Sequence, residues 1–294
     1  MTGKTKLWNR ISSVLIYTFL LLISLTCLLP FVHVLAKSVS EEAFVVSNQV
    51  ILLPKGFNLE AYKKVLADAS ILRSLYVTVV IMIAFTVIGM IITLCAAYPL
   101  SRRNLKGRSV ITVFFMITMY FSGGIIPEYL LMNGLHMLDT WWCMILPLAF
   151  SASNLLIMKT SLMSSIPDSL IESAHIDGAN EFTILVKIII PLSKPIIATL
   201  SLFYAVGRWN SYQDALFYIK QNTALRPLQL KLYNLVVSAS EAVQDSVQGT
   251  SSVVMSPEVL KAACIMFATI PIICVYPFVQ KYFVQGTMIG SVKE

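Results

Sequence analysis

The chain has 294 residues and a formal net charge of +7. Hydrophobic residues make up 57% of it and charged residues only 13%. With a mean hydropathy of +0.77, these values lie outside the range of soluble globular domains. The composition therefore excludes a soluble enzyme and predicts an integral membrane protein.

Six apolar runs are long enough to cross a hydrocarbon core, which takes about 20 helical residues. Backbone groups in lipid must satisfy their own hydrogen bonds, so each run is expected to be a helix. We predict an all-α polytopic membrane protein with one domain over residues 1–294. Its expected spans are residues 11–36, 71–99, 109–133, 140–162, 196–217 and 259–283.

The first apolar run follows a basic N-terminus, as a secretory signal would, but it is much longer than a signal core. We therefore expect it to be an uncleaved span.

The distribution of Lys and Arg predicts the orientation of the spans. If the N-terminus is cytoplasmic, the inside segments hold 12 basic residues and the longer outside segments hold 9. The strongest local bias is Arg102, Arg103, Lys106 and Arg108 in the second connection. Both termini and the loop 164–195 are therefore expected in the cytoplasm. The positive charge is typical of residues that flank spans, and no nucleic-acid partner is expected.

The third run is interrupted by Ser122-Gly123-Gly124 and by Pro127. Small residues allow neighbouring helices to pack closely. A helix break is also tolerated in a membrane where it lines a water-filled pathway. The sequence leaves both interpretations open.

The acidic stretch, residues 166–195, lies between the fourth and fifth runs. Pro167 suits the first turn of a helix, and Leu170, Ile171 and Ala174 recur at helical spacing. Gly178 suits a left-handed C-terminal cap, and a second helix is expected after it. The stretch carries the acids Asp168, Glu172, Asp177 and Glu181, and Asn180 is the expected cap of the second helix.

The charge of the acidic stretch predicts what it contacts. A helix that lies on the cytoplasmic leaflet is usually basic on its polar face, because that leaflet is negative. This stretch is acidic and still has an apolar stripe to bury. We therefore predict a cytoplasmic protein partner that accepts a short helix in a groove.

The same residues resemble a known motif, the EAA signature of permease subunits of type I ABC importers. Ser173 stands where that signature usually has alanine. The matching residues are Glu172, Ser173, Ala174, Asp177, Gly178, Ala179, Ile188 and Pro191.

Further segments are similar to carbohydrate-uptake permeases of the LplC-type branch, which resembles the MalG-side subunit of maltose-type transporters. They are "VILLPKGFNLEAYKKVL", "YFSGGIIPEYLLMNGLHMLDTWWCMILP", "LFYAVGRWNSYQDALFYI" and "VQKYFVQGTMIGSVK". The resemblance implies the type I importer permease fold in a bacterial cytoplasmic membrane. It also implies a role in oligosaccharide import, with plant- or glycan-derived oligosaccharides among the expected substrates.

The resemblance further implies partners. These are a second permease subunit in a heterodimer, two copies of a cytosolic ABC ATPase, an extracytoplasmic sugar-binding lipoprotein and the lipid bilayer. The EAA residues are expected to couple the chain to the ATPase, which binds ATP and Mg. No cofactor or metal site and no enzymatic activity are expected in this chain. The polar tail, residues 284–294, is expected to leave the membrane and reach the ATPase.

Two other functions have less support in the residues. An ion-driven secondary transporter usually has acids at mid-membrane, whereas Glu128 and Asp214 lie in the expected outer halves of their spans. An intramembrane enzyme would need a metal-ligand or nucleophile motif, and none surrounds His33, His136 or His175. The ion-driven transporter is the main alternative.

Arg208 is the one basic residue inside an expected span, where a charge is costly unless it faces a cavity or a partner. Tyr204 and Tyr212 are spaced four residues on either side of it, so we expect all three on one helix face. Such a face suits a sugar pathway, although a polar clamp between the two permeases is an equal alternative. The remaining candidate residues for the pathway are Trp209, Gln213, Asn154 and Tyr120.

Overall fold

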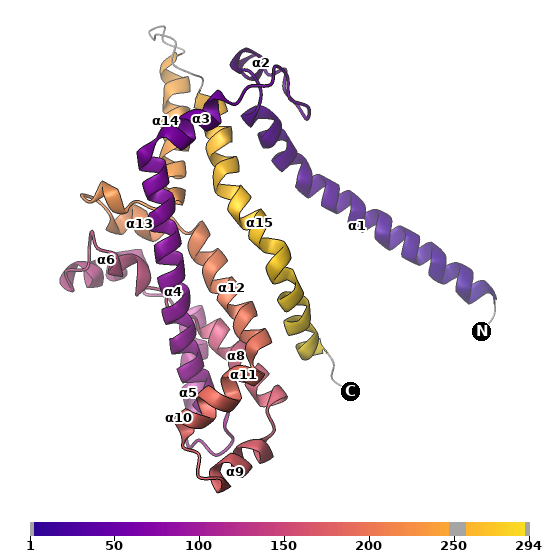
Figure 1. The fold of residues 1–294 in the computed structure, drawn as a ribbon, viewed down its shortest axis with the longest axis vertical. Coiled ribbons are helices and arrows are strands. Elements are labelled where there is room, and N and C mark those ends of the chain that lie inside the picture. The colour runs from indigo at the N-terminus through magenta and orange to yellow at the C-terminus, as the bar shows by residue number, and fades with distance from the viewer. Residues whose placement is uncertain (1–2, 247–256, 292–294) are drawn as a thin grey trace. The chain divides into compact units, whose positions relative to one another are not determined.

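The computed structural model describes residues 3–246 and 257–291, and within them it forms helices joined by loops (Figure 1). The chain divides into two compact units, each described here by itself. Unit 1 comprises Met1–Ala69 and Leu232–Ile270, and unit 2 comprises Ser70–Lys231 and Pro271–Glu294. All candidate functional residues lie in unit 2.

Three of the described helices are long and apolar enough to cross a membrane alone, and two bent helix pairs add up to two further spans. The described residues thus contain three to five candidate spans, and the predicted count of six is not confirmed. The three single helices are α1 (Gly3–Ser38), α4 (Ala69–Ser101) and α15 (Pro257–Ser291).

The predicted fourth span, residues 140–162, is broken in the structure. It contains the short α7 (Trp142–Ile145) and the 14-residue α8 (Ala152–Ser165), which is below the length that crosses a membrane. Between them Pro147 has no backbone N–H, and Leu148 has a φ of +63°. These two residues prevent one continuous helix.

The predicted third span is also broken, into α5 (Arg108–Tyr120) and α6 (Ile125–Gly134), which are bent by 109°. Gly124 at the break has a φ of +85°, and a Cβ built there would meet nothing within 4 Å. The glycine is therefore needed for backbone conformation. Within this chain Gly124 does not serve close helix packing, which is one of the two interpretations of the sequence.

The predicted fifth span ends early. α12 (Lys194–Asn210) stops before Ser211 and Tyr212, and α13 (Gln213–Tyr218) follows as a separate short helix. The next connection, expected to be a polar loop, contains the 3-10 turn η2 (Thr223–Leu225) and α14 (Leu228–Ser246).

The sequence also predicts Ser256 as the N-cap of the last helix and Pro257 as its first helical residue. The helix α15 begins at Pro257, and Ser256 lies outside the described residues. Gly286 and Gly290 predict breaks in the polar tail. α15 instead continues through both glycines to Ser291, because neither glycine is obliged to end a helix.

Unit 1 contains α1 and two short helices, α2 (Glu42–Val46) and α3 (Glu60–Ala67). An isolated bridge pairs Ser40, just before α2, with Phe57 in the loop that leads to α3. Lys37 at the end of α1 forms an ion pair with Glu258 at the start of α15, with 3.4 Å between Nζ and Oε2.

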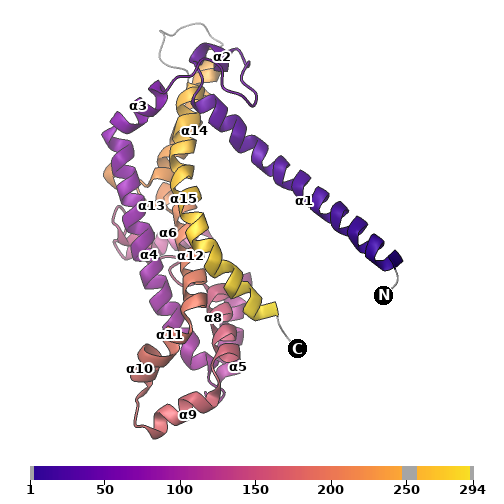
Figure 2. The ribbon, with the colours of Figure 1, turned by 45° about the vertical axis from the view of Figure 1, so that its right-hand side comes forward.

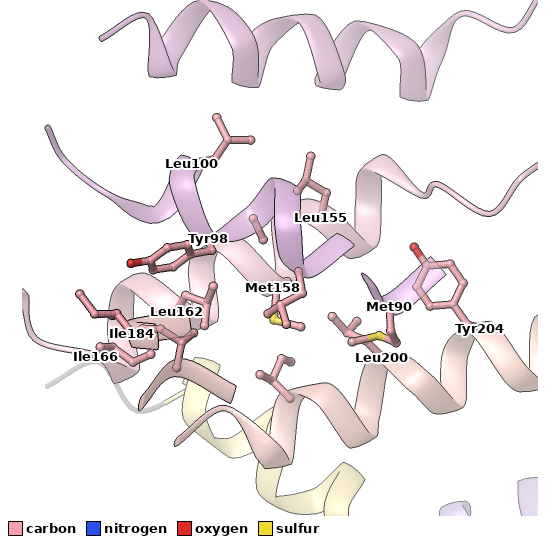
Figure 3. Packing of buried hydrophobic residues seen from close by; sticks show 14 of the residues in the cluster. Met90, Tyr98, Leu100, Leu155, Met158, Leu162, Ile166, Ile184, Leu200 and Tyr204 are labelled. Carbon is pink, nitrogen blue, oxygen red and sulfur yellow. The ribbon is translucent and has the colours of Figure 1, made fainter. Parts of the chain in front are cut away.

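The main core of unit 2 joins three helices. Met158 of α8 lies between Leu155 and Leu162 of the same helix, and it packs among side chains of α4 and α12 (Figure 3). The residues contributed by α4 and α12 include Met90, Tyr98, Leu100, Leu200 and Tyr204.

A backbone nest ties the α6–α7 loop to the segment after α13. One carboxylate oxygen of Asp139 accepts hydrogen bonds of 2.9 Å from the successive amides of Lys220, Gln221 and Asn222. These amides, with Asn222 first, lower the pKa of Asp139 below its usual value. The Asp139 carboxylate thus holds residues 220–222, which form no helix, against the α6–α7 loop.

Gly89 marks the closest approach of α4 to its neighbours. A Cβ at this position would lie 2.9 Å from the backbone oxygen of Ala149 and 3.0 Å from a ring carbon of Tyr204. The backbone oxygen cannot rotate away, so we expect Gly89→Val to destabilise unit 2 by about 1–3 kcal/mol. Gly207→Ala is the matched control, because nothing lies within 4 Å of a Cβ there. Equal thermal unfolding temperatures for the two variants, measured on purified complex, would contradict this close contact.

Candidate functional site

The acidic stretch begins where α8 ends, and it forms the end of unit 2 around α9 (Asp168–Ile176) (Figure 1 and Figure 2). Pro167 is the N-cap of α9, with a φ of −63°. Asp168 follows in the first turn, where the helix dipole favours an acid. Its carboxylate also lies 3.8 Å from Arg102 and 3.5 Å from Arg103. These contacts attach the start of α9 to the end of α4.

The end of α9 is a Schellman motif built on Gly178. This glycine has a φ of +79°, as predicted for a left-handed cap. The Ala179 amide donates to the Ala174 carbonyl over 2.9 Å, and the Gly178 amide donates to His175 over 3.0 Å. Asn180 then caps α10 (Glu181–Ile184) by accepting a 2.8 Å hydrogen bond from the Thr183 amide. The helix-glycine-helix prediction is confirmed.

α9 buries one narrow edge and exposes the rest. Ile171 and Ala174 are only 6% and 7% exposed and belong to the core of unit 2. Leu170 was expected in the same stripe but is exposed, because only one edge of this short helix reaches the core. Ile176 is 86% exposed and Phe182 74% exposed. The acidic stretch thus offers two large apolar side chains on its outer surface.

Glu181 anchors this outer surface to the body of unit 2. The Tyr98 hydroxyl at the end of α4 donates a 2.5 Å hydrogen bond to Glu181 Oε2. His175 Nε2 lies 3.3 Å from the other carboxylate oxygen. One side chain therefore links α4, α9 and α10. A movement of α9 can be transmitted through these polar contacts to α4.

The segment that joins the acidic stretch to α12 has an irregular backbone. The π-helix η1 (Leu185–Ile189) carries Ile188, and α11 (Ile190–Leu192) carries Pro191. The chain then bends by 83° at Ser193 into α12. π-helical turns are rare and often mark functional sites.

The polar cluster of α12 consists of Arg208, Ser211 and Asp214. The guanidinium of Arg208 forms an ion pair with Asp214, and the two side chains are only 3% and 8% exposed. Ser211 donates a 2.9 Å hydrogen bond to the same carboxylate. The ring of Phe85 lies 5.5 Å from the Arg208 guanidinium. The charge of Arg208 is thus neutralised inside unit 2.

The aromatic neighbours in α12 are buried too. The Tyr204 hydroxyl and Thr93 Oγ1 share a 2.7 Å hydrogen bond between α12 and α4. Trp209 is 5% exposed, and its indole N–H has no hydrogen-bond partner among the described residues. Asn154 of α8 is also buried. Tyr120, at the last turn of α5, is 83% exposed.

A comparison with protein families decides what this arrangement is. Residues 89–289, more than half of the chain, match the family described as "Binding-protein-dependent transport system inner membrane component". This range includes the whole acidic stretch and the α12 cluster. The chain is a permease subunit of this ABC importer family.

Relatives of the permease agree over nearly its full length. It is 44% identical to the polygalacturonan/rhamnogalacturonan transport system permease protein YtcP of Bacillus subtilis, over 97% of this chain and 99% of the relative. It is 41% identical to Protein LplC of the same organism, over 90% of this chain and 89% of that protein.

A solved structure is similar as well, that of a bacterial ABC transporter involved in import of the acidic polysaccharide alginate. Its matching chain is 33% identical with a TM-score of 0.81, and the match covers 96% of this permease and 99% of that chain. Relatives in this family are sugar permeases and non-catalytic, so the permease is not an enzyme. The ion-driven alternative receives no support. The expected membrane location is confirmed as an inner-membrane component.

Two expectations about the permease need correction. Tyr212 does not share a helix face with Tyr204 and Arg208, because α12 ends at Asn210 and Tyr212 is the N-cap of α13. Gln213 is the first residue of α13 and is exposed, so it does not lie beside Arg208 on one helix either. The argument from regular spacing fails because a helix break changes the direction of each following side chain.

Sequence reasoning missed three partners of the permease's site residues. Asp214 was considered only as an ion site, although it pairs with Arg208. Tyr98 and Arg102 lie far from the acidic stretch in the chain, and no local pattern marks them as its contacts. A carboxylate six residues from an intramembrane arginine was the one signal that could have been followed.

Proposed function

We propose that this permease imports oligosaccharides that carry uronate carboxylates. The observation that supports this most directly is an agreement between two separate comparisons. The YtcP relative is named for transport of polygalacturonan and rhamnogalacturonan, whose galacturonate units carry carboxylates, and the solved importer is described as importing the acidic polysaccharide alginate. Both matches extend over at least 96% of the chain. Neither comparison identifies the individual sugar.

We further propose how the subunit is assembled. Membership of a binding-protein-dependent family implies an ATPase and a substrate-binding protein as partners. In our proposal the permease pairs with a second permease, two ATPase copies and one extracytoplasmic lipoprotein, and both of its termini are cytoplasmic. All six expected spans, including those that are broken helices, then form one domain in the bilayer.

The acidic stretch is proposed as the ATPase contact. Its exposed Ile176 and Phe182 can enter an apolar groove of the ATPase, and Glu172, Ser173 and Asp177 are exposed polar residues of the same stretch. The buried Ile171 and Ala174 would carry the movement into the core of unit 2. Ile188 and Pro191 then lie on the irregular segment that leads to α12.

Among the candidate residues for the sugar pathway, exposure separates two roles. Tyr120 and Gln213 are exposed and are proposed to contact sugar directly. Tyr204, Arg208, Trp209 and Asn154 are buried and are proposed to hold the helices that border the pathway. Tyr212 is half-buried at the break between α12 and α13.

The substrate proposal is tested by uptake into proteoliposomes that contain the full complex with its binding protein. Trigalacturonate and trimannuronate are compared with maltotriose, which has no carboxylate. A charge-assisted hydrogen bond discriminates by about tenfold or more, so uronate uptake is expected to exceed maltotriose uptake at least about tenfold. Equal or preferred uptake of maltotriose would contradict the proposal.

A further inference from the structure

Two cations that form no ion pair among the described residues lie where α5 and α8 meet, at the expected cytoplasmic ends of the third and fourth spans. Lys159 of α8 donates a 2.9 Å hydrogen bond to Thr112 Oγ1 of α5. One turn away, Arg108 Nη1 is buried and has no hydrogen-bond partner among the described residues. The charged neighbour that acts on Lys159 is Arg108, a second cation.

No acid balances these charges in the part of the chain that the structure describes: its five ion pairs involve neither Arg108 nor Lys159. The helix end adds to the imbalance. α5 begins after Gly107 with no side-chain cap, and its first residue is Arg108, where the helix dipole favours a negative group. The site has the electrostatics of an anion-binding site whose anion comes from outside the chain.

The same helix pair forms an open groove further along. The α5–α8 groove has a volume of ≈ 560 Å³, which is in the range of pockets that bind drug-sized ligands. Its first lining residue on α5, Phe114, lies two residues from Thr112, or roughly 3 Å along the helix axis. It is lined by Phe114, Phe115, Thr118, Met119, Phe150, Ser151, Ala152 and Ser153.

The lining of the groove combines two chemistries. The rings of Phe115 and Phe150 lie 5.1 Å apart, and Phe114 lies 5.9 Å from Phe115. Ser151 and Ser153 share a hydrogen bond of 2.9 Å between their hydroxyls at the other side. Aromatic faces can pack on the apolar face of a pyranose ring, and hydroxyl groups can pair with its hydroxyls. An acyl chain would use only the aromatic half.

We propose that the α5–α8 groove and the Arg108–Lys159 pair form one binding track for a uronate oligosaccharide. The groove holds a sugar ring, and the two cations bind the carboxylate of a ring further toward the cytoplasm. Arginine can bind a carboxylate with two parallel hydrogen bonds, and lysine adds a point charge. The inference rests on the proposed function and gives that function a specificity-determining site.

The test compares variants of the full complex in proteoliposomes, with trigalacturonate and its uncharged methyl ester as probes. Arg108→Gln and Lys159→Gln are each expected to lower trigalacturonate uptake about tenfold, the effect of one charge-assisted hydrogen bond. Lys159→Arg keeps the charge and is expected to keep uptake. Lys106→Gln removes an exposed cation from the same connection and is the matched control. Complex abundance is held equal by size-exclusion chromatography.

The groove is tested separately from the charges. Phe114→Ala is expected to lower uptake of both probes about fivefold, because an aromatic contact does not sense the carboxylate. Ile117→Ala removes an exposed side chain of α5 that does not line the groove, and it is expected to behave like the parent.

The outcomes separate this inference from the proposed function. If the parent takes up no trigalacturonate, the proposed function fails and the track fails with it. If the parent takes it up and Arg108→Gln and Lys159→Gln match the parent, only the track is overturned. A loss that is equal for both probes and varies with the phosphatidylglycerol content of the vesicles would overturn it in favour of a lipid headgroup site.

Discussion

Gly178→Val is expected to abolish uptake while the complex still inserts and assembles. Gly178 has a φ of +79°, a conformation that a β-branched residue resists strongly. A Cβ there would meet nothing within 4 Å, so the defect comes from the backbone and not from a clash. Valine would break the two hydrogen bonds that end α9 and would change the angle between α9 and α10. The helices would then no longer present Ile176 and Phe182 together.

The measurements are uptake in membranes and ATP hydrolysis stimulated by the loaded binding protein. Gly178→Asn is the matched control at the same position, because asparagine adopts positive φ far more readily than valine. It is expected to retain most of the coupled hydrolysis. Normal transport and normal ATPase recruitment in Gly178→Val would remove the acidic stretch from its proposed role.

Arg208→Ala and Asp214→Asn are both expected to lower the amount of folded complex sharply. The two side chains form a buried ion pair, and removal of one partner leaves an unpaired buried charge. Such a loss typically destabilises a protein by about 3–5 kcal/mol. Because the defect lies in folding, uptake of acidic and of neutral substrates is expected to fall together. Complex abundance, measured after purification in detergent, is the primary readout.

A double variant separates this clamp from a role in the pathway. Arg208→Ala combined with Asp214→Asn removes both charges, so its loss of abundance is expected to be smaller than the sum of the single losses. Lys106→Gln, which removes an exposed cation before α5, serves as the neutral control for charge removal. If Arg208→Lys instead has normal abundance and loses only uronate uptake, Arg208 acts in the sugar pathway and the structural role is contradicted.

Local chemistry made part of this protein predictable. The cap at Gly178 and the cap at Asn180 depend on backbone conformation and on hydrogen bonds that reach only three to five residues along the chain. The long helices α1 and α4 follow from uninterrupted apolar runs. The EAA residues were found for the same reason, since their spacing reflects one helix, one turn and a second helix.

Other features depend on residues that are distant in the chain. Glu181 is held by Tyr98, 83 residues earlier, and hydropathy carries no information about that pairing. The break at Leu148 and the π-helical turn at Leu185–Ile189 lie inside apolar segments whose sequence predicts a regular α-helix.

The sequence by itself determined the membrane location, the family and the position of the acidic stretch, because composition, helix caps and short motifs act over a few neighbouring residues. Only the tertiary structure decided which charges are neutralised. It paired Arg208 with Asp214 across a helix break, and it left Arg108 and Lys159 together with no acidic partner among the residues that the structure describes. Charge pairing depends on distance in space, which the order of residues along a broken helix does not specify.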